Sequence, residues 1–297
     1  MTSTATARDQ RRRQLQLEAA ARARAVRVRR RRRRLVGGAV AVVVVAVAAM
    51  IGVAAVRGSG SGGSGTPTGD GVPIAKMLAD TPQQTISAIG LGSAQFLPFA
   101  VHDAPLTSDG KPEVLYLGAD YCPFCAAERW PLVLALSRFG TFTNLGLTTS
   151  GEGEVFAGTH TFSFHDSAYR SDYISFVGRE LYDNVPISRG RFHPLDKATD
   201  AESALLAKYG NAFPIVDFGG RYVQNKASYS PGILKGMSAN DIAMAVGIPQ
   251  SPVAEAIGGS ANALTAAICG VTGGKPAAVC TDPAIVAALS KINASSG

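Results

Sequence analysis

The sequence is poor in the residues that build metal centres and disulfide frameworks. Its 297 residues include 4 cysteines and 4 histidines. The histidines have no HxxxH-type spacing, so they indicate no metal site, and four cysteines are too few for a disulfide-dense miniprotein. No internal repeat is visible either. We therefore expect no cofactor and no resident metal, and the positions of the cysteines must indicate their role.

Most of the chain has no excess of positive charge. Thirteen of the 29 lysines and arginines are arginines between Arg8 and Arg34, where the only acids are Asp9 and Glu18, which makes a net charge of +11 there. The other 16 basic and 20 acidic residues leave the rest of the chain at −4. This mildly acidic remainder argues against a nucleic-acid-binding domain. A hydrophobic content of 46%, with 17% charged residues, is enough for a sizeable core and excludes disorder throughout.

A stretch of 22 residues without a charge begins at Leu35 and ends at Val56. About 20 apolar residues cross the hydrocarbon core of a bilayer, whereas the apolar part of a signal peptide has about 7–15. We interpret the stretch as an uncleaved transmembrane helix; a buried core helix and a cleavable signal peptide are the alternatives. Six consecutive arginines precede it, whereas only Arg57 follows it closely. The positive-inside rule then keeps the N-terminus in the cytoplasm and exports the rest, although the arginines also suit a nucleic-acid arm or a twin-arginine signal.

The sequence therefore divides into four segments. The run GSGSGGSG after the apolar stretch cannot bury apolar surface and is typical of a flexible tether. From about Lys76 the pattern becomes globular. We expect an Arg-rich cytoplasmic tail (1–34), a transmembrane helix (35–56), a flexible linker (57–75) and an exported domain (76–297). This predicts a single-pass protein of the cell membrane whose C-terminal domain lies outside the cytoplasm.

The exported domain is predicted to alternate strands and helices around one CxxC motif. Residues 113–119 form an apolar run of strand length, and residues 126–139 carry apolar residues at helical spacing. The motif lies between them, and residues 142–148 are predicted as the next strand. Further strands are predicted over 161–164 and 173–177, and a hairpin with a Gly-Gly turn over 213–223. Helices are predicted over 196–209, 240–246, 253–257, 262–268 and 283–292, and over 77–89 with an interruption near Thr81-Pro82.

Cys122-Pro123-Phe124-Cys125 is the motif with the clearest chemistry. Its spacing puts both sulfurs in the first turn of a helix, whose N-terminus stabilises a thiolate. We expect Cys122 to be the exposed nucleophile and Cys125 the buried resolving thiol that releases the substrate. The same spacing also makes half a zinc site or a simple structural loop, so the motif alone leaves these alternatives open.

The strand before CPFC, the motif itself and Phe213-Pro214 entering a β-hairpin together resemble the thioredoxin fold. The resemblance implies that Pro214 is cis and faces the cysteines, and that the backbone of Phe213 binds a substrate chain. Tyr121 is expected to border the nucleophile. Pro214 follows Cys125 by 89 residues, about twice the spacing of a minimal thioredoxin. We therefore expect an α/β thioredoxin-like fold with an insertion, containing residues 161–180, between the CxxC βαβ unit and the cis-Pro hairpin.

Three further segments extend the resemblance. They are YCPFCAAERW at residues 121–130, HTFSF at 160–164 followed by DYISFV at 172–177, and the late Ile268-Cys269 and Val279-Cys280. Together they are similar to a family of prokaryotic membrane-anchored thioredoxin-like proteins of unassigned function. The similarity runs from about Lys76 to the C-terminus and implies thiol-disulfide chemistry without naming a substrate.

Three other residues complete the set of candidate functional residues. Glu128 lies three residues after Cys125, so it is a candidate proton relay for that thiol; the alternative is a solvated charge that pairs with Arg129. Cys269 and Cys280 are expected to form a structural disulfide, worth about 2–3 kcal/mol, although a second redox pair is the alternative.

The sequence as a whole predicts a membrane-anchored thiol-disulfide oxidoreductase. Its partners would be exported protein thiols or disulfides, an unidentified redox partner, and the membrane through residues 35–56. One alternative is a copper or zinc carrier that uses Cys122 and Cys125 as ligands, with His102 or His165 approaching the motif in space. The other is a non-catalytic domain that binds an envelope partner.

Overall fold

The computed structural model describes residues 71–294 of the chain. The predicted tail, the predicted transmembrane helix and most of the predicted linker lie outside the described residues. Within residues 71–294, no helix is both long and apolar enough to cross a membrane. Helix α2 (Gly71–Ala79) begins five residues before the predicted domain start at Lys76, so the end of the predicted linker is helical. The interruption predicted near Thr81-Pro82 is confirmed: α2 ends at Ala79, and α3 (Gln83–Ser87) begins after Pro82.

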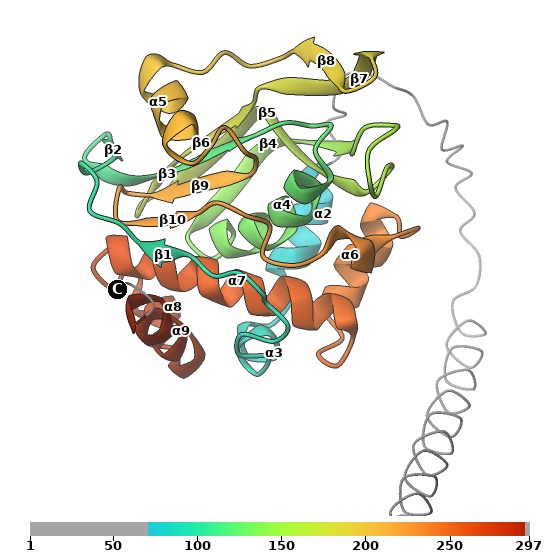
Figure 1. Ribbon diagram of the computed structural model, residues 1–297. Coiled ribbons are helices and arrows are strands. Elements are labelled where there is room, and N and C mark those ends of the chain that lie inside the picture. Colours follow the sequence, from blue (N-terminus) through green and yellow to red (C-terminus); the bar gives the residue numbers. More distant parts are fainter. Residues whose placement is uncertain (1–70, 295–297) are drawn as a thin grey trace, which may run out of the picture. The chain divides into compact units, whose positions relative to one another are not determined.

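A mixed six-stranded sheet organises the α/β fold (Figure 1). Its central strand β3 (Lys111–Gly118) lies parallel to β6 (Ser175–Glu180) and antiparallel to β9 (Ile215–Phe218). The β9 strand pairs with β10 (Tyr222–Gln224), which together form the predicted hairpin. Two short strands complete the sheet, β1 (Phe99–Ala100) beside β10 and β2 (Thr107–Ser108) beside the start of β3.

Strand β3 is apolar along most of its length because both faces of the sheet are covered. Val114 and Tyr116 point into the main core, which they share with α4 (Pro123–Leu136) and α7 (Pro252–Val271). Leu115 and Leu117 point the other way, into a smaller cluster closed by Leu206 of α5 (Asp200–Lys208). Alternate residues of a strand face opposite sides, so the continuous run of residues 114–117 satisfies both cores.

The strand that follows the CxxC helix does not join β3, which corrects the predicted βαβ unit. Strand β4 (Gly140–Thr149) pairs with β5 (His160–Ser171) in a separate antiparallel hairpin. The parallel neighbour of β3 is β6, so the crossover runs β3, α4, β6, with the β4–β5 hairpin inside it. The predicted insertion over 161–180 therefore contains one strand of the central sheet. The reason is that short alternating strands do not specify their partner, which tertiary packing selects.

A second hairpin, β7 (Tyr182–Ser188) and β8 (Arg191–Pro194), follows β6 and precedes α5. The predicted helix over 196–209 starts later, at Asp200, where Thr199 and Glu202 form a capping box. These elements lie between β6 and β9 in the chain. They put an additional hairpin next to the end of β3, where the CxxC motif begins (Figure 1).

The C-terminal part is helical, with one correction to the prediction. The two helices predicted over 253–257 and 262–268 are a single helix, α7, because Gly258 and Gly259 do not break it. A Cβ atom on Gly259 would lie 2.3 Å from the Leu91 carbonyl oxygen, so this glycine permits close packing within a continuous helix. The other elements here are η1 (Pro231–Leu234), α6 (Ala239–Val246), α8 (Ala277–Cys280) and α9 (Pro283–Ala294).

Candidate functional site

The two cysteines of CPFC lie at the junction between β3 and α4. Cys122 is the N-cap of α4, and its backbone N–H donates to the Ala119 carbonyl at 3.1 Å. Pro123 occupies the first turn, where its missing N–H leaves no helical bond unmade. The backbone N–H of Cys125 donates to Cys122 Sγ at 3.2 Å. Both cysteines are free thiols, so the structure represents the reduced pair.

The two thiols have unequal environments. The Cys125 side chain is completely buried, and this burial raises its pKa well above the ordinary value. The pKa of Cys122 is lowered, first by a hydrogen bond with the Cys125 thiol and also by backbone N–H groups at the helix start and by Arg129. Cys122 is 7% exposed, so the prediction of an exposed nucleophile is wrong in this state. Its sulfur is partly covered because Tyr121 and Phe213 pack against the cysteine pair.

Phe213, Pro214 and Tyr121 surround the cysteines. The Phe213–Pro214 peptide bond is cis and directly precedes β9, the antiparallel neighbour of β3. The Tyr121 ring stacks on Phe192 of β8 with centroids 4.1 Å apart, and burial raises the pKa of its hydroxyl to about 12. The inserted β7–β8 hairpin is thereby attached to the residue that precedes the first cysteine.

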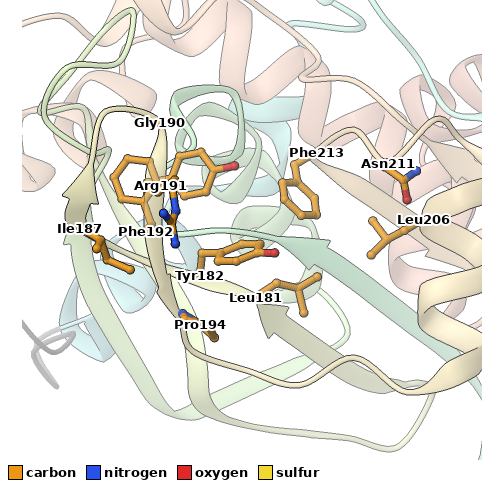
Figure 2. Close-up of a pocket in the computed structure, with 11 residues that line it drawn as sticks. Leu181, Tyr182, Ile187, Gly190, Arg191, Phe192, Pro194, Leu206, Asn211 and Phe213 are labelled. Atoms are coloured by element: carbon orange, nitrogen blue, oxygen red, sulfur yellow. The ribbon is translucent and has the colours of Figure 1, made fainter.

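Two cavities flank this group of residues. One, of about 610 Å³, is lined by Tyr121 and Phe213 together with residues of the β7–β8 hairpin and α5. Figure 2 shows Phe213, Leu206 and Asn211 on one side of it, and Ile187 with Phe192 on the other. The second cavity, of about 370 Å³, is lined by Phe213 and by Phe124 of the motif itself. Space for a bound molecule therefore lies beside Phe213, which packs against the cysteine pair, although neither cysteine lines either cavity.

Beneath the motif lies a buried charged cluster. Arg129 donates to Glu180 through Nε at 2.8 Å and Nη2 at 2.6 Å, and to the Ala119 carbonyl at 2.7 Å. Asp120 Oδ1 lies 3.5 Å from Arg129 Nη2, and Asp120 Oδ2 accepts from Ser163 Oγ at 3.1 Å. Burial raises the pKa of the Asp120 and Glu180 carboxyls, and the positive charge of Arg129 opposes that rise. The guanidinium also contributes to lowering the pKa of Cys122, so the cluster is electrostatically linked to the CPFC cysteines.

Glu128 lies in the core, against the loop that follows β10, and its role as a proton relay stays a prediction. It is completely buried, and its carboxyl accepts from Ser228 N at 2.6 Å and is 3.0 Å from Ser228 Oγ. It is therefore not a solvated charge, and Arg129 pairs with Glu180 instead. Burial raises the pKa of Glu128 to about 8. Its hydrogen bonds go to the loop after β10, and among the described residues it has no hydrogen bond to either cysteine of the motif.

Residues 97–191 match the family model described as "Domain of unknown function (DUF929)". The match is to a family without an assigned function, and it gives no thioredoxin-like identity. No curated protein and no solved structure matches the chain. The DUF929 segment contains β3, CPFC, α4 and the β4–β5 hairpin, and it ends before Phe213 and Pro214.

Within the DUF929 segment, sequence reasoning missed the cluster of Asp120, Arg129 and Glu180. Arg129 lies in the helix PFCAAERWPLVLAL, in which every residue except Phe124 is buried. A charged residue in so apolar a helix must have a buried partner, since an unpaired charge is strongly disfavoured in a protein interior. That signal indicates that a partner exists, although it does not identify Glu180, which follows 51 residues later.

The remaining candidate residues lie away from CPFC. Cys269 and Cys280 are joined by a disulfide with Cα atoms 5.5 Å apart, as the predicted pairing requires. His165 approaches Asp196, at 2.7 Å, and Asp166, at 3.3 Å. In the described part of the chain, no three His, Cys, Asp or Glu side chains gather as a metal site would require.

Proposed function

We propose that this protein is a membrane-anchored thiol-disulfide oxidoreductase that acts on protein thiols outside the cytoplasm. The observation that carries the proposal is the inequality of the two CPFC thiols. Cys122 caps a helix and has a lowered pKa, whereas Cys125 is completely buried and has a raised pKa. A nucleophile and a resolving thiol need this difference, because only the first must be a thiolate before the substrate arrives.

The reaction is an exchange of two electrons between two pairs of thiols. The Cys122 thiolate attacks a substrate disulfide, forms a mixed disulfide and releases one substrate thiolate. Cys125 then loses its proton and attacks Cys122 Sγ, which forms the Cys122–Cys125 disulfide and releases the second substrate thiolate. The substrate is reduced and the protein is oxidised; the reverse sequence oxidises a substrate dithiol.

A thioredoxin-like arrangement is part of the proposal, and the topology supports it. The β3–α4–β6 crossover puts the motif between two parallel strands, and β9 with β10 continues the sheet on the other side of β3. Phe213, at the start of this hairpin, packs against the cysteines. The membrane anchor and its orientation rest on residues 35–56 and the arginines before them.

Single cysteine variants of the full chain test the function. Cys122→Ser should abolish exchange with a model peptide disulfide, because the attacking thiolate is gone. Cys125→Ser should complete the first step and stop as a mixed disulfide, because no resolving thiol remains. Trapping in cells with Cys125→Ser, followed by mass spectrometry, should identify the bound proteins. Equal, slow alkylation of both cysteines with no exchange would contradict the proposal.

A further inference from the structure

The two cavities next to Phe213 have this residue in common. Phe213 lines both, and it also contacts the cysteine pair. The cysteines themselves line neither cavity, so a polypeptide joined to Cys122 through its own cysteine would reach either cavity past Phe213. Leu181 and Ile187 give the larger cavity an apolar surface, and Phe96 and Phe124 do the same for the smaller one.

The charged side chains that line the two cavities are all basic. Neither lining contains an aspartate or a glutamate, and each contains one basic residue, Arg191 in the larger cavity and Lys226 in the smaller one. Within residues 71–294, neither takes part in an ion pair. Both side chains are exposed, and Lys226 Nζ lies 5.0 Å from the centre of the Phe96 ring. Each cavity thus has an apolar surface and a cation that forms no ion pair with any residue of 71–294.

The positive charge in the two cavity linings contrasts with the net negative charge of residues 71–294. Residues 71–294 contain 15 basic and 19 acidic side chains, a net charge of −4. Asp120, Glu128 and Glu180, which lie on or against the CPFC helix, are buried. Glu154, on the connection between β4 and β5, interacts electrostatically with Tyr121 but lines neither cavity. Inside the two cavities, the only charged side chains that an approaching chain meets are therefore Arg191 and Lys226.

We infer that the site accepts segments of polypeptide in which the reactive cysteine has acidic and apolar side chains on both sides. Arg191 and Lys226 would each pair with a carboxylate, and the apolar walls would cover the neighbouring side chains. This inference rests on the proposed oxidoreductase function and adds the substrate class. Charges at the edge of an interface chiefly accelerate association, so the preference should appear in the exchange rate and decrease with salt.

A set of three disulfide-bonded peptides tests the inference. They have the same length and apolar residues, and the flanking positions carry aspartate, asparagine or lysine. With the full-length reduced protein, we expect the acidic peptide to exchange fastest and the basic one slowest, with a difference of roughly fivefold for each cation and a smaller difference at high salt. Arg191→Gln and Lys226→Gln should each reduce the ratio between acidic and basic peptides. Arg170→Gln and Lys275→Gln, exposed cations outside both cavities, are the matched controls and should leave the ratio unchanged.

The outcomes separate the inference from the function on which it rests. Equal exchange rates for the three peptides would overturn the substrate class and leave the oxidoreductase function intact. A preference that persists in Arg191→Gln and Lys226→Gln would also overturn the inference, because other residues would then cause it. No exchange with any peptide would overturn the proposed function, and the inference with it.

Discussion

Arg129 and Glu180 form a doubly hydrogen-bonded ion pair in which neither side chain is exposed. The pair joins the helix that carries the cysteines to the last residue of β6, the strand parallel to β3. The ion pair therefore holds α4 against the C-terminal end of β6. Removing one partner of such a pair leaves the other charge buried without compensation.

Glu180→Gln should lower the free energy of unfolding by about 3 kcal/mol, because Arg129 loses its main counter-charge. Urea denaturation of the variant and the wild type measures the difference. Asp103→Asn is the control: it removes the exposed Asp103–Lys208 pair and should change the stability little. A change in Glu180→Gln no larger than in the control would contradict the role assigned to the buried pair.

Glu128 should make the stability fall as the pH rises. Its pKa is about 8 in the folded protein, whereas an unfolded glutamate has about 4.3. The folded state holds this proton more tightly, so its stabilising effect is complete below about pH 4.3 and is lost as the pH rises to 8, by up to about 1.4 kcal/mol per pH unit. Glu128→Gln cannot ionise and should lose this part of the pH dependence.

Urea denaturation at pH 5 and pH 8 measures the effect of Glu128. Asp120 and Glu180 shift in the same direction but are present in both proteins, so the difference between wild type and Glu128→Gln isolates Glu128. Glu255→Gln, at an exposed position, should behave as the wild type does. The same pH dependence in the wild type and in Glu128→Gln would show that Glu128 ionises as an exposed glutamate does.

Cys125→Ala should raise the pKa of Cys122. The hydrogen bond with the Cys125 thiol is the largest cause of the lowered Cys122 pKa, and alanine removes it. The rate of iodoacetamide alkylation against pH, measured on the reduced protein, should therefore shift to higher pH in the variant. Cys122→Ser supplies the background rate. Coincident pH profiles for Cys125→Ala and wild type would mean that the helix N-terminus and Arg129 lower the pKa without the Cys125 thiol.

The arginines before residue 35 predict the orientation of the chain in the membrane. In cells with an intact envelope, a membrane-impermeant maleimide should label Ser64→Cys, in the predicted linker, and should not label Ser3→Cys, in the predicted tail. Both variants should be labelled after the cells are lysed, which controls for reactivity. The opposite pattern in intact cells would reverse the predicted topology.

Local features of the site were readable from the sequence. An apolar run followed by CPFC and a helical pattern is sufficient to predict β3, α4 and the position of Cys122 at the helix start, because strand and helix periodicity act over a few residues. The same applies to the hairpin of β9 and β10, which the Gly219-Gly220 turn predicts. The pairing of Cys269 with Cys280 also follows from their short separation.

Other features depend on which segments meet in three dimensions. The sequence suggests that β4 follows α4 but cannot indicate that β6 becomes the neighbour of β3, since several alternating strands could occupy that place. The burial of Cys122 depends on Tyr121 and on Phe213, which lies 91 residues further along the chain.

The charged residues of α4 show most clearly which features the sequence determines and which depend on the tertiary structure. The sequence determined that Glu128 and Arg129 lie on the helix that begins at the CPFC motif, because helical spacing is a local property. Only the tertiary structure decided that Glu128 bonds Ser228 and that Arg129 pairs with Glu180. The physical reason is that a buried polar side chain must find a partner, and that partner comes from whichever distant element the packing of the core places beside it.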